Sequence, residues 1–566
     1  MKRRQPLRDA PDSARPSEPA WPPVAPTQAE AEIASPDPRR RSLLHAAAAG
    51  ATLGAFGIPA AGQAQPVPVR GGQLVVAMPG RPRHLNPALL SGSPMMPAAQ
   101  LFASPMVMGP DWKPRPYLAE RWSVSEDGRS ITLHLRRDAV FHDGRPVTAE
   151  DVEFSVQAVR DHHPFKGMFA PVHAVTLPDR HTAVVRLAEP HPALQLAMTT
   201  VFVPILPRHV YGDGQPLAAH PRNSAQVVGS GPFRLVEFKP GEHLILQRFD
   251  AFFLKDRPLL DRLVFREFKD PASIVLAFER GEIDYVPFVN DPKEIARLRR
   301  VPGARVHDDH LPGVGSLVWL AFNTRHPKLA DQRVRQAISH AIDRDFIVKH
   351  LATGAVRVST GPIHSSSPFY TADVPRQSFD PRRSMALLDA AGLRPGGDGK
   401  RLSLSCDTPN ATDQRLLAEY LRPALAKVGI DVTLRVAPDF PTWARRVGDH
   451  DFEMTADSVW NWGDPVIGVH RTYQSSNIRK GVIWSNTQQY ANPRVDELLA
   501  QAGRERDVAA RKKLYAEMQR IVVDDCPIAY VFETGFAGAL ARTVAPHAFG
   551  VWGPLAPLDG LGMARV

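Results

Sequence analysis

The sequence predicts a mixed α/β protein in which helices cover packed β-sheets. Three observations lead to this fold class. A run of apolar, mostly β-branched residues follows paired glycines at 71–77, apolar and polar residues alternate at 131–135, and a helical pattern at 416–425 leads directly into an alternating segment at 430–436. A succession of helices and strands is typical of a sheet with covering helices. With 566 residues, the chain is long enough for more than one hydrophobic core.

The elements of the first half follow from local patterns. The uninterrupted apolar run at 74–77 indicates a buried strand. The alternating segment that follows predicts a half-buried strand with its inward side chains at Ile131, Leu133 and Leu135. Thr148 and Asp151 then have nearly the spacing of a capping box. The helix that they would begin has one apolar face, formed by Val152, Val156 and Val159.

Two further helices and a strand are predicted in the second half. Asp331 is placed to cap a helix whose apolar stripe consists of Val334, Ala337, Ile338, Ala341 and Ile342. The next helix should bend at Pro423 and end at Gly429. Its apolar residues are Leu416, Leu417, Tyr420, Leu421 and Leu425. The strand that follows alternates through Ile430, Val432, Leu434 and Val436.

The first 64 residues are not expected to belong to the fold. Residues 1–38 are rich in proline, alanine and mixed charge, and such a composition favours disorder. An uncharged stretch of small residues then follows three arginines, which resembles a twin-arginine export signal with Arg40 and Arg41 as the pair and cleavage after Ala64. The alternative is a retained membrane anchor, since the stretch approaches spanning length. Its alanine and glycine content favours cleavage and export to the periplasm.

Charge and cysteine content exclude two classes of protein. The 69 basic and 59 acidic residues are spread along the chain without a lysine or arginine block, so no nucleic-acid partner is expected. The two cysteines, Cys406 and Cys526, cannot form a disulfide scaffold, and without a recognised spacing they are expected to be free and buried rather than paired.

No motif in the chain indicates catalysis, a cofactor or a metal. The stretches FHDG at 141–144 and GSGP at 229–232 are interpreted as turns, because neither has the spacing of a nucleophile elbow or a phosphate loop. The stretch HDDH at 307–310 is the most metal-like cluster, but an exposed polar loop before a strand explains it more simply. No nucleophile, base and orienting group can be assembled from the sequence.

Longer stretches of the sequence resemble a known family. WSVSEDG at 122–128 and LRRDAVFHDGRPVTAEDV at 135–152 are similar to the signature of the bacterial extracellular solute-binding proteins of family 5, the peptide, dipeptide, nickel and opine receptors of ABC importers. Further matches occur in the family's order: GSGPF at 229–233, LAFNT at 320–324 and RVRQAI at 333–338. The resemblance covers nearly all of residues 71–566.

The resemblance implies a two-lobed periplasmic binding protein fold of type II, with three subdomains, a hinge and a ligand cleft between the lobes. The core of lobe I would comprise 71–104, 225–315 and 531–566, its inserted subdomain 105–224, and lobe II 316–530. The resemblance also implies a monomer that hands its ligand to the transmembrane subunits of an ABC permease.

The family further points to a ligand site. Its peptide receptors often carry, in lobe II, Trp and Gly residues around an aspartate that pairs with the ligand's α-ammonium group; the matching segment here is WNWGDPVIGVHRTY at 460–473, which is shorter. If Asp464 aligns with a later Asp-Pro of the family, Asn461 or Trp462 occupies the anchor position. We expect Trp462 to supply apolar contact, with Asp464 and Arg471 supplying charge. The remaining expected ligand contacts are Ser91, Ser93, Trp460, Asn461 and Tyr473. The alternative is that the tryptophans are core residues.

The predicted function is therefore that of the substrate-binding component of an ABC importer, with a peptide or peptide-like ligand. The alternatives are a metal-chelate, haem or opine receptor of the same family, or an exported hydrolase. Stabilisation by a ligand without turnover would indicate a receptor, whereas product formation would indicate an enzyme.

Overall fold

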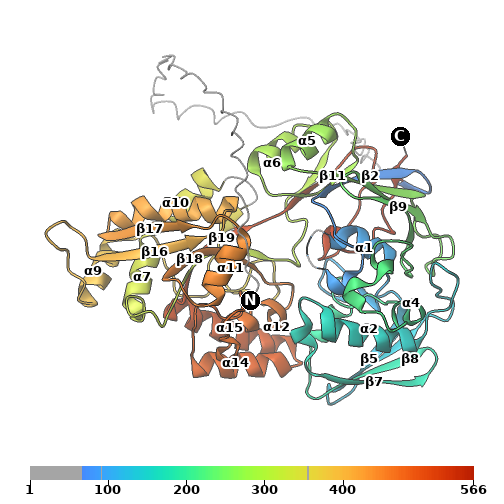
Figure 1. Cartoon of the computed structure of the whole chain (residues 1–566), viewed down its shortest axis with the longest axis horizontal. Helices are drawn as coiled ribbons and strands as arrows, with labels where there is room; N and C mark the ends of the chain where they lie inside the picture. The colour runs from blue at the N-terminus through green and yellow to red at the C-terminus, as the bar shows by residue number, and fades with distance from the viewer. Residues whose placement is uncertain (1–66, 91, 93, 353–355, 566) are drawn as a thin grey trace, which may run out of the picture. The chain divides into compact units, whose positions relative to one another are not determined.

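Figure 1 shows the computed structural model, which describes residues 67–565 except 91, 93 and 353–355. Its strands form two large sheets and one smaller sheet, together with short two-stranded pairs. The predicted leader at 1–64, with Arg40 and Arg41, lies outside the described residues.

The first large sheet has seven strands and receives segments from three parts of the chain. In spatial order these are β13 (Arg305–His307), β20 (Ala537–Leu540), β12 (Tyr285–Val289), β2 (Gln73–Pro79), β11 (Arg262–Phe268), β10 (His243–Arg248) and β9 (Phe233–Lys239). The predicted strand at 74–77 is β2, which is confirmed as a buried strand with one core on each face. Helices α5 (Pro271–Glu279) and α6 (Pro292–Leu298) cover one of these faces.

The smaller sheet lies within residues 105–224, the predicted insertion. Its four strands are β5 (Ala119–Val124), β6 (Ser130–Leu135), β8 (Thr182–Leu187) and β7 (Val172–Asp179). The alternating pattern correctly predicts β6, because every second residue of this strand is buried. The capping box is also confirmed: Thr148 precedes α2 (Ala149–His162), and its backbone N–H donates to Asp151 Oδ2 at 2.8 Å.

The second large sheet has six strands and is covered by helices on both faces (Figure 1). The strands are β15 (Val356–Val358), β19 (Ile528–Thr534), β14 (Ser316–Phe322), β18 (Met454–Trp460), β16 (Leu402–Thr408) and β17 (Ile430–Val436). Every residue of β14 is buried: Leu317 and Trp319 face one core, and Val318 and Leu320 face the other. Because β14 is buried on both faces, it lacks the alternation that marks a half-buried strand.

The helices on these two faces include both of those predicted in the second half. One face carries α7 (Gln332–His340), α9 (Pro381–Ala390) and α10 (Thr412–Ala426), and the other carries α14 (Pro493–Arg504) and α15 (Val508–Asp525). Asp331 caps α7 as predicted, accepting from the backbone N–H of Arg333 at 2.8 Å. Pro423 lies inside α10, and Gly429 adopts a φ of +85° just before β17.

The chain crosses between the two large sheets twice. It leaves the first sheet after β13, enters the second at β14, and returns between β19 and β20. Strand β19 continues to Thr534, so the second sheet extends beyond the expected boundary at Tyr530.

The interpretation of 307–310 as an exposed loop is wrong for His310, which is buried. The hydroxyl of Tyr285 lies 2.5 Å from His310 Nε2 and gives the ring a partner inside the protein, while burial lowers the pKa of His310 to about 3. Within residues 67–565, apart from the gaps named above, no group of three or more His, Cys, Asp or Glu side chains is arranged to hold a metal ion, and no helix has the length and apolarity to cross a membrane. Cys406 and Cys526 are both free and buried.

Candidate ligand-binding site

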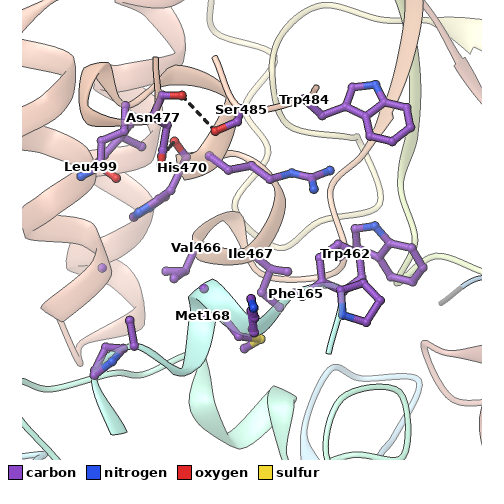
Figure 2. A pocket seen from close by; sticks show the side chains of 18 of the residues that line it. Phe165, Met168, Trp462, Val466, Ile467, His470, Asn477, Trp484, Ser485 and Leu499 are labelled. Carbon is purple, nitrogen blue, oxygen red and sulfur yellow. Dashed lines mark hydrogen bonds between the residues drawn. The ribbon is translucent and has the colours of Figure 1, made fainter. Parts of the chain in front are cut away.

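A cavity of about 790 Å³ lies between the inserted subdomain and the helices beside the second sheet. The inserted subdomain contributes the segment around η2 (Lys166–Phe169) and residues 189–191. The other wall consists of the end of β18, the short helices α12 (Pro465–Gly468) and α13 (His470–Tyr473), part of α14, and the loop at 482–485 (Figure 2). The cavity therefore has walls from two parts of the chain that are far apart in sequence.

Aromatic side chains form much of the apolar wall. The rings of Phe165 and Trp462, which both line the cavity, are in direct contact with their centroids 4.9 Å apart, and Trp460 packs against Trp462 at 6.3 Å. Trp460 is 38% exposed, whereas Trp462 is only 2% exposed. Trp462 thus belongs both to the hydrophobic core and to the cavity wall, so each of the two interpretations of this residue describes part of its environment.

The backbone at Trp462 has an unusual conformation. Its φ is +53°, and that of Gly463 is +81°, so two consecutive residues are left-handed where the chain turns from β18 into α12. A bulky residue rarely adopts this region, and such positions persist where the surroundings fix them. Here the backbone N–H of Trp462 donates to Val314 O at 3.1 Å, and the indole is held in the core.

Asp464, the predicted charge contact, is paired inside the protein. Both of its carboxylate oxygens accept from Arg511, at 2.8 and 3.0 Å, and Oδ1 also caps α12 by accepting from Val466 N. Burial favours a raised pKa for Asp464, but the Arg511 guanidinium outweighs it and holds the pKa below its usual value. The structure thus gives Asp464 a partner of its own and does not place it along this cavity.

Arg471 is in the opposite situation. It lines the cavity, and its guanidinium carbon lies 5.6 Å from the centroid of the Phe165 ring. Nε is buried without an acceptor, and among the described residues no hydrogen bond or ion pair satisfies this side chain. Burial lowers its pKa to about 10, although the charge of Asp457 acts in the opposite direction. Arg471 therefore remains a cation at neutral pH.

Asp457 is a buried carboxylate behind the cavity wall. It accepts from the backbone N–H of Ser458 at 2.6 Å and from the indole N–H of Trp484 at 3.0 Å. Burial raises its pKa to about 7, despite these hydrogen bonds and the charge of Arg471. Its role in the structure is to position the Trp484 ring, which lines the cavity.

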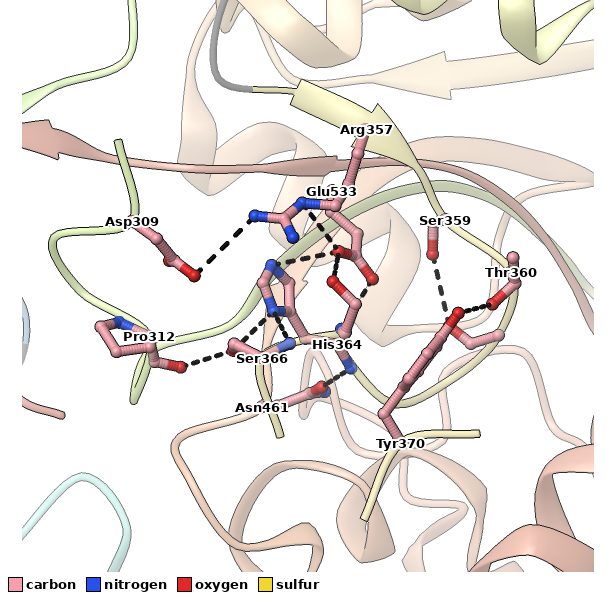
Figure 3. Close-up of polar contacts among 12 residues, drawn as sticks. Asp309, Pro312, Arg357, Ser359, Thr360, His364, Ser366, Tyr370, Asn461 and Glu533 are labelled. Atoms are coloured by element: carbon pink, nitrogen blue, oxygen red, sulfur yellow. Dashed lines mark hydrogen bonds and ion pairs between the residues drawn. The ribbon is translucent and has the colours of Figure 1, made fainter. Parts of the chain in front are cut away.

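The other predicted contacts have different surroundings. Asn461 is buried; its side chain accepts from His364 N at 2.6 Å and donates to Pro362 O at 3.3 Å (Figure 3). Tyr473 is buried in the core with its hydroxyl 2.7 Å from that of Tyr530, away from the cavity lining. Ser91 and Ser93 lie outside the described residues.

Figure 3 shows the polar network around Asn461, which lies where the chain crosses between the large sheets. Ser365 donates to Glu533 through its backbone N–H and its hydroxyl, at 2.8 and 2.5 Å. Ser366 Oγ donates to Pro312 O at 2.8 Å, so the network connects the segment between β15 and α9 with the segment that leads from β13 to β14. Glu533 itself lies in β19, just before the return crossing.

Neither histidine of the cavity wall is available as a charged group. His191 Nε2 lies 2.8 Å from Met168 O, and His470 Nε2 lies 2.9 Å from the hydroxyl of Tyr515. Burial lowers the pKa of both, that of His470 to about 3, so both rings are neutral at physiological pH.

Sequence reasoning did not identify Phe165, Asp457 or Trp484 as parts of this region. Phe165 reaches the cavity from the inserted subdomain, about 300 residues before Trp462 in the chain. Residue type was the only available signal, since each is an aromatic or acidic residue, and many others in the chain fit that description.

Comparison with known proteins places this arrangement in context. The model for bacterial extracellular solute-binding proteins, family 5 middle region, matches residues 113–489, which is more than half of the chain. The dipeptide-binding protein of Escherichia coli is 27% identical over 435 residues, covering 73% of this chain and 79% of that protein. Heme-binding protein A of Haemophilus influenzae is 27% identical over 448 residues, covering 75% and 79%, respectively.

A solved structure shows the same fold. An ABC transporter-associated periplasmic binding protein from Helicobacter pylori, in complex with the peptide STSA, superposes with a TM-score of 0.71 at 23% identity. The match covers 87% of this chain and 99% of that one. The fold is therefore the mixed α/β fold of the periplasmic binding proteins, as the sequence predicts.

Proposed function

Because the chain belongs to the bacterial extracellular solute-binding proteins of family 5, we propose that it is the substrate-binding component of an ABC importer. It captures a peptide or peptide-like solute outside the cytoplasmic membrane and delivers it to the transmembrane permease. The observation that carries this proposal is the cavity of about 790 Å³, with aromatic walls from two parts of the chain and an unpaired arginine. A largely apolar pocket with a few polar groups is the usual form of a small-molecule site.

The same geometry supports closure around a ligand. The contacts that join the inserted subdomain to the second-sheet side include Phe165 with Trp462, Phe165 with Arg471, and an ion pair of 2.5 Å between Glu189 and Arg504. A solute held between these walls would contact both and favour the closed arrangement over the open one. The two chain crossings are the positions where such a hinge would act.

A receptor role accounts for the site better than catalysis does. The two histidines of the wall are neutral and have partners inside the protein, as described above. The relatives reported above are also named as binding proteins. We therefore expect the protein to be stabilised by its solute without converting it.

The decisive experiment is mass spectrometry of small molecules that co-purify with the mature protein, followed by thermal unfolding with the molecules found. A peptide that raises the unfolding midpoint and is recovered unchanged supports the proposal. Recovery of hydrolysed peptide would instead indicate an exported hydrolase. A Soret absorption band in the purified protein would favour haem, the ligand named for one of the relatives, over a peptide.

Export is a separate part of the proposal. We propose that Arg40 and Arg41 direct the chain through the twin-arginine route and that the mature, monomeric protein begins after Ala64 in the periplasm. Replacing both arginines by lysine should leave the chain in the cytoplasm, as cell fractionation would show. Normal periplasmic recovery of this variant would contradict the twin-arginine route.

A further inference from the structure

The buried and half-buried arginines of this protein differ in how their charge is satisfied. Arg335 donates to four backbone carbonyl groups, at 2.7–3.0 Å, and Arg344 donates to several carbonyl groups and to a serine hydroxyl. Arg511 has its two bonds to Asp464. Arg471 has no such partner in the part of the chain that the structure describes. Arg471 is half-buried, and its Nε is inaccessible to solvent and has no acceptor, so this exception requires an explanation.

Among the described residues, the charged side chains around the cavity do not supply a counter-ion for Arg471. Of the other charged residues that line the cavity, Glu189 and Arg504 pair with each other, while Lys166 and Arg479 add positive charge. Asp457 acts on Arg471 without forming an ion pair with it and is occupied by Ser458 N and Trp484 Nε1. The cavity therefore contains an excess of positive charge, and an anion would be attracted to it.

The residues around Arg471 suit a ligand in which a carboxylate is attached to an apolar group. A guanidinium can donate two parallel hydrogen bonds to one carboxylate, which a single ammonium group cannot. Beside it, Phe165, Trp460, Trp462 and Ile467 form an apolar wall. A carboxylate held by Arg471 would thus place its substituent against aromatic rings.

We propose that the solute of this protein bears a carboxylate that pairs with Arg471 and an apolar group that packs on Phe165 and Trp460. The inference rests on the proposed function and narrows it to anionic solutes. For a peptide, the group in question is a free C-terminal carboxylate after an apolar residue. For other solutes, it is the carboxylate of an apolar organic acid.

The test uses thermal unfolding of the mature protein after exhaustive dialysis, with three probe pools. The first contains di- and tripeptides with apolar C-terminal residues and free carboxyl ends, the second contains the same peptides as C-terminal amides, and the third contains non-peptide apolar carboxylates. Arg471→Gln removes the proposed anchor. Arg422→Gln is the control for the removal of one positive charge, because Arg422 is exposed and does not line the cavity.

We expect the free peptides to raise the unfolding midpoint of the natural protein and of Arg422→Gln, and the amides to have little effect. Calorimetry with the most stabilising peptide should show about a hundredfold or greater loss of affinity in Arg471→Gln, as is usual when one partner of a buried charge pair is removed. Circular dichroism of the variant checks that its fold is unchanged.

The remaining outcomes separate the two proposals. Equal stabilisation by free and amidated peptides, unaffected by Arg471→Gln, would overturn the carboxylate inference and leave the peptide receptor intact. Stabilisation by the third pool alone, if it depends on Arg471, would refute the proposal that the solute is a peptide and support the proposal that it bears a carboxylate. If neither of the two pools that contain free carboxylates stabilised the protein, the carboxylate inference would be overturned.

Discussion

At the scale of single residues, the two arginines near the cavity show how pairing decides the cost of burial. Arg511 and Asp464 neutralise each other in the core, whereas Arg471 has no counter-ion. We expect Arg511→Gln to lower the free energy of unfolding by about 3–5 kcal/mol, because it leaves a buried carboxylate unpaired. Arg471→Gln should leave this free energy unchanged or raise it by about 1 kcal/mol. Urea denaturation of the ligand-free proteins measures both; equal destabilisation would contradict this account.

Asp457 provides a prediction about pH. Its pKa in the folded protein, about 7, is above its unfolded value, so its contribution to stability is fully present below the unfolded pKa and is lost as pH rises through 7. Asp457→Asn keeps an acceptor for Trp484 but has no charge to bury. The variant should therefore gain stability over the natural protein between pH 5 and pH 8, by an amount on the order of a few kcal/mol.

The control for this prediction is Asp431→Asn, which alters an exposed ion pair with Lys400. Its stability relative to the natural protein should not change with pH over the same range, since exposed pairs contribute little. Denaturation at several pH values gives the two differences. A constant offset for Asp457→Asn would show that this carboxyl group is already ionised in the folded protein throughout that range, so that its pKa is not raised.

The sequence could indicate only part of the site. The match at 460–473 drew attention to the segment that contains Arg471, although this segment is shorter than in the family and the alignment of Asp464 stayed open. It could not reveal that Arg511, 47 residues after Asp464, neutralises that aspartate, or that Tyr473 points into the core. Such partners are brought together by tertiary packing, and no local spacing encodes them.

At the scale of elements, local patterns predicted well wherever one face of an element is exposed. Strand β6 and the capped helices α2 and α7 have clear periodicity and were predicted from it. Strands β14 and β19 are buried on both faces, so their apolar runs give no periodicity and no boundary. The stretch at 229–232 shows another limit: it was interpreted as a turn, but its glycines also allow two backbones to approach closely.

The prediction at this scale concerns Gly229, which lies against the end of α1 (Met95–Leu101). A Cβ added there would lie 1.9 Å from Leu101 O, closer than any contact can be, so the backbone would have to move. We expect Gly229→Ala to lower the free energy of unfolding by about 1–3 kcal/mol, the usual cost of overpacking. The control, Gly167→Ala, adds a Cβ with nothing within 4 Å and should be nearly neutral. Thermal denaturation distinguishes them, and equal midpoints would refute the steric argument.

At the scale of the whole molecule, the proposed hinge predicts a change of size. The contacts between Phe165 and Trp462 and between Glu189 and Arg504 require the two walls of the cavity to be close. Adding the identified solute should lower the radius of gyration measured by small-angle scattering, because it favours this arrangement. An unchanged radius in a saturated sample would exclude closure as the response to ligand.

The double crossing of the chain also constrains the order of folding during synthesis. Strand β19 lies between β15 and β14 in the second sheet, and β20 lies between β13 and β12 in the first, so neither is an edge strand. Both nascent sheets lack an interior strand until Ile528–Thr534 has emerged from the ribosome, and the first sheet lacks one until Leu540 has emerged. The two sheets are therefore completed almost simultaneously. A ribosome-stalled chain ending before Ile528 should accordingly be sensitive to protease in both sheets, not in one alone.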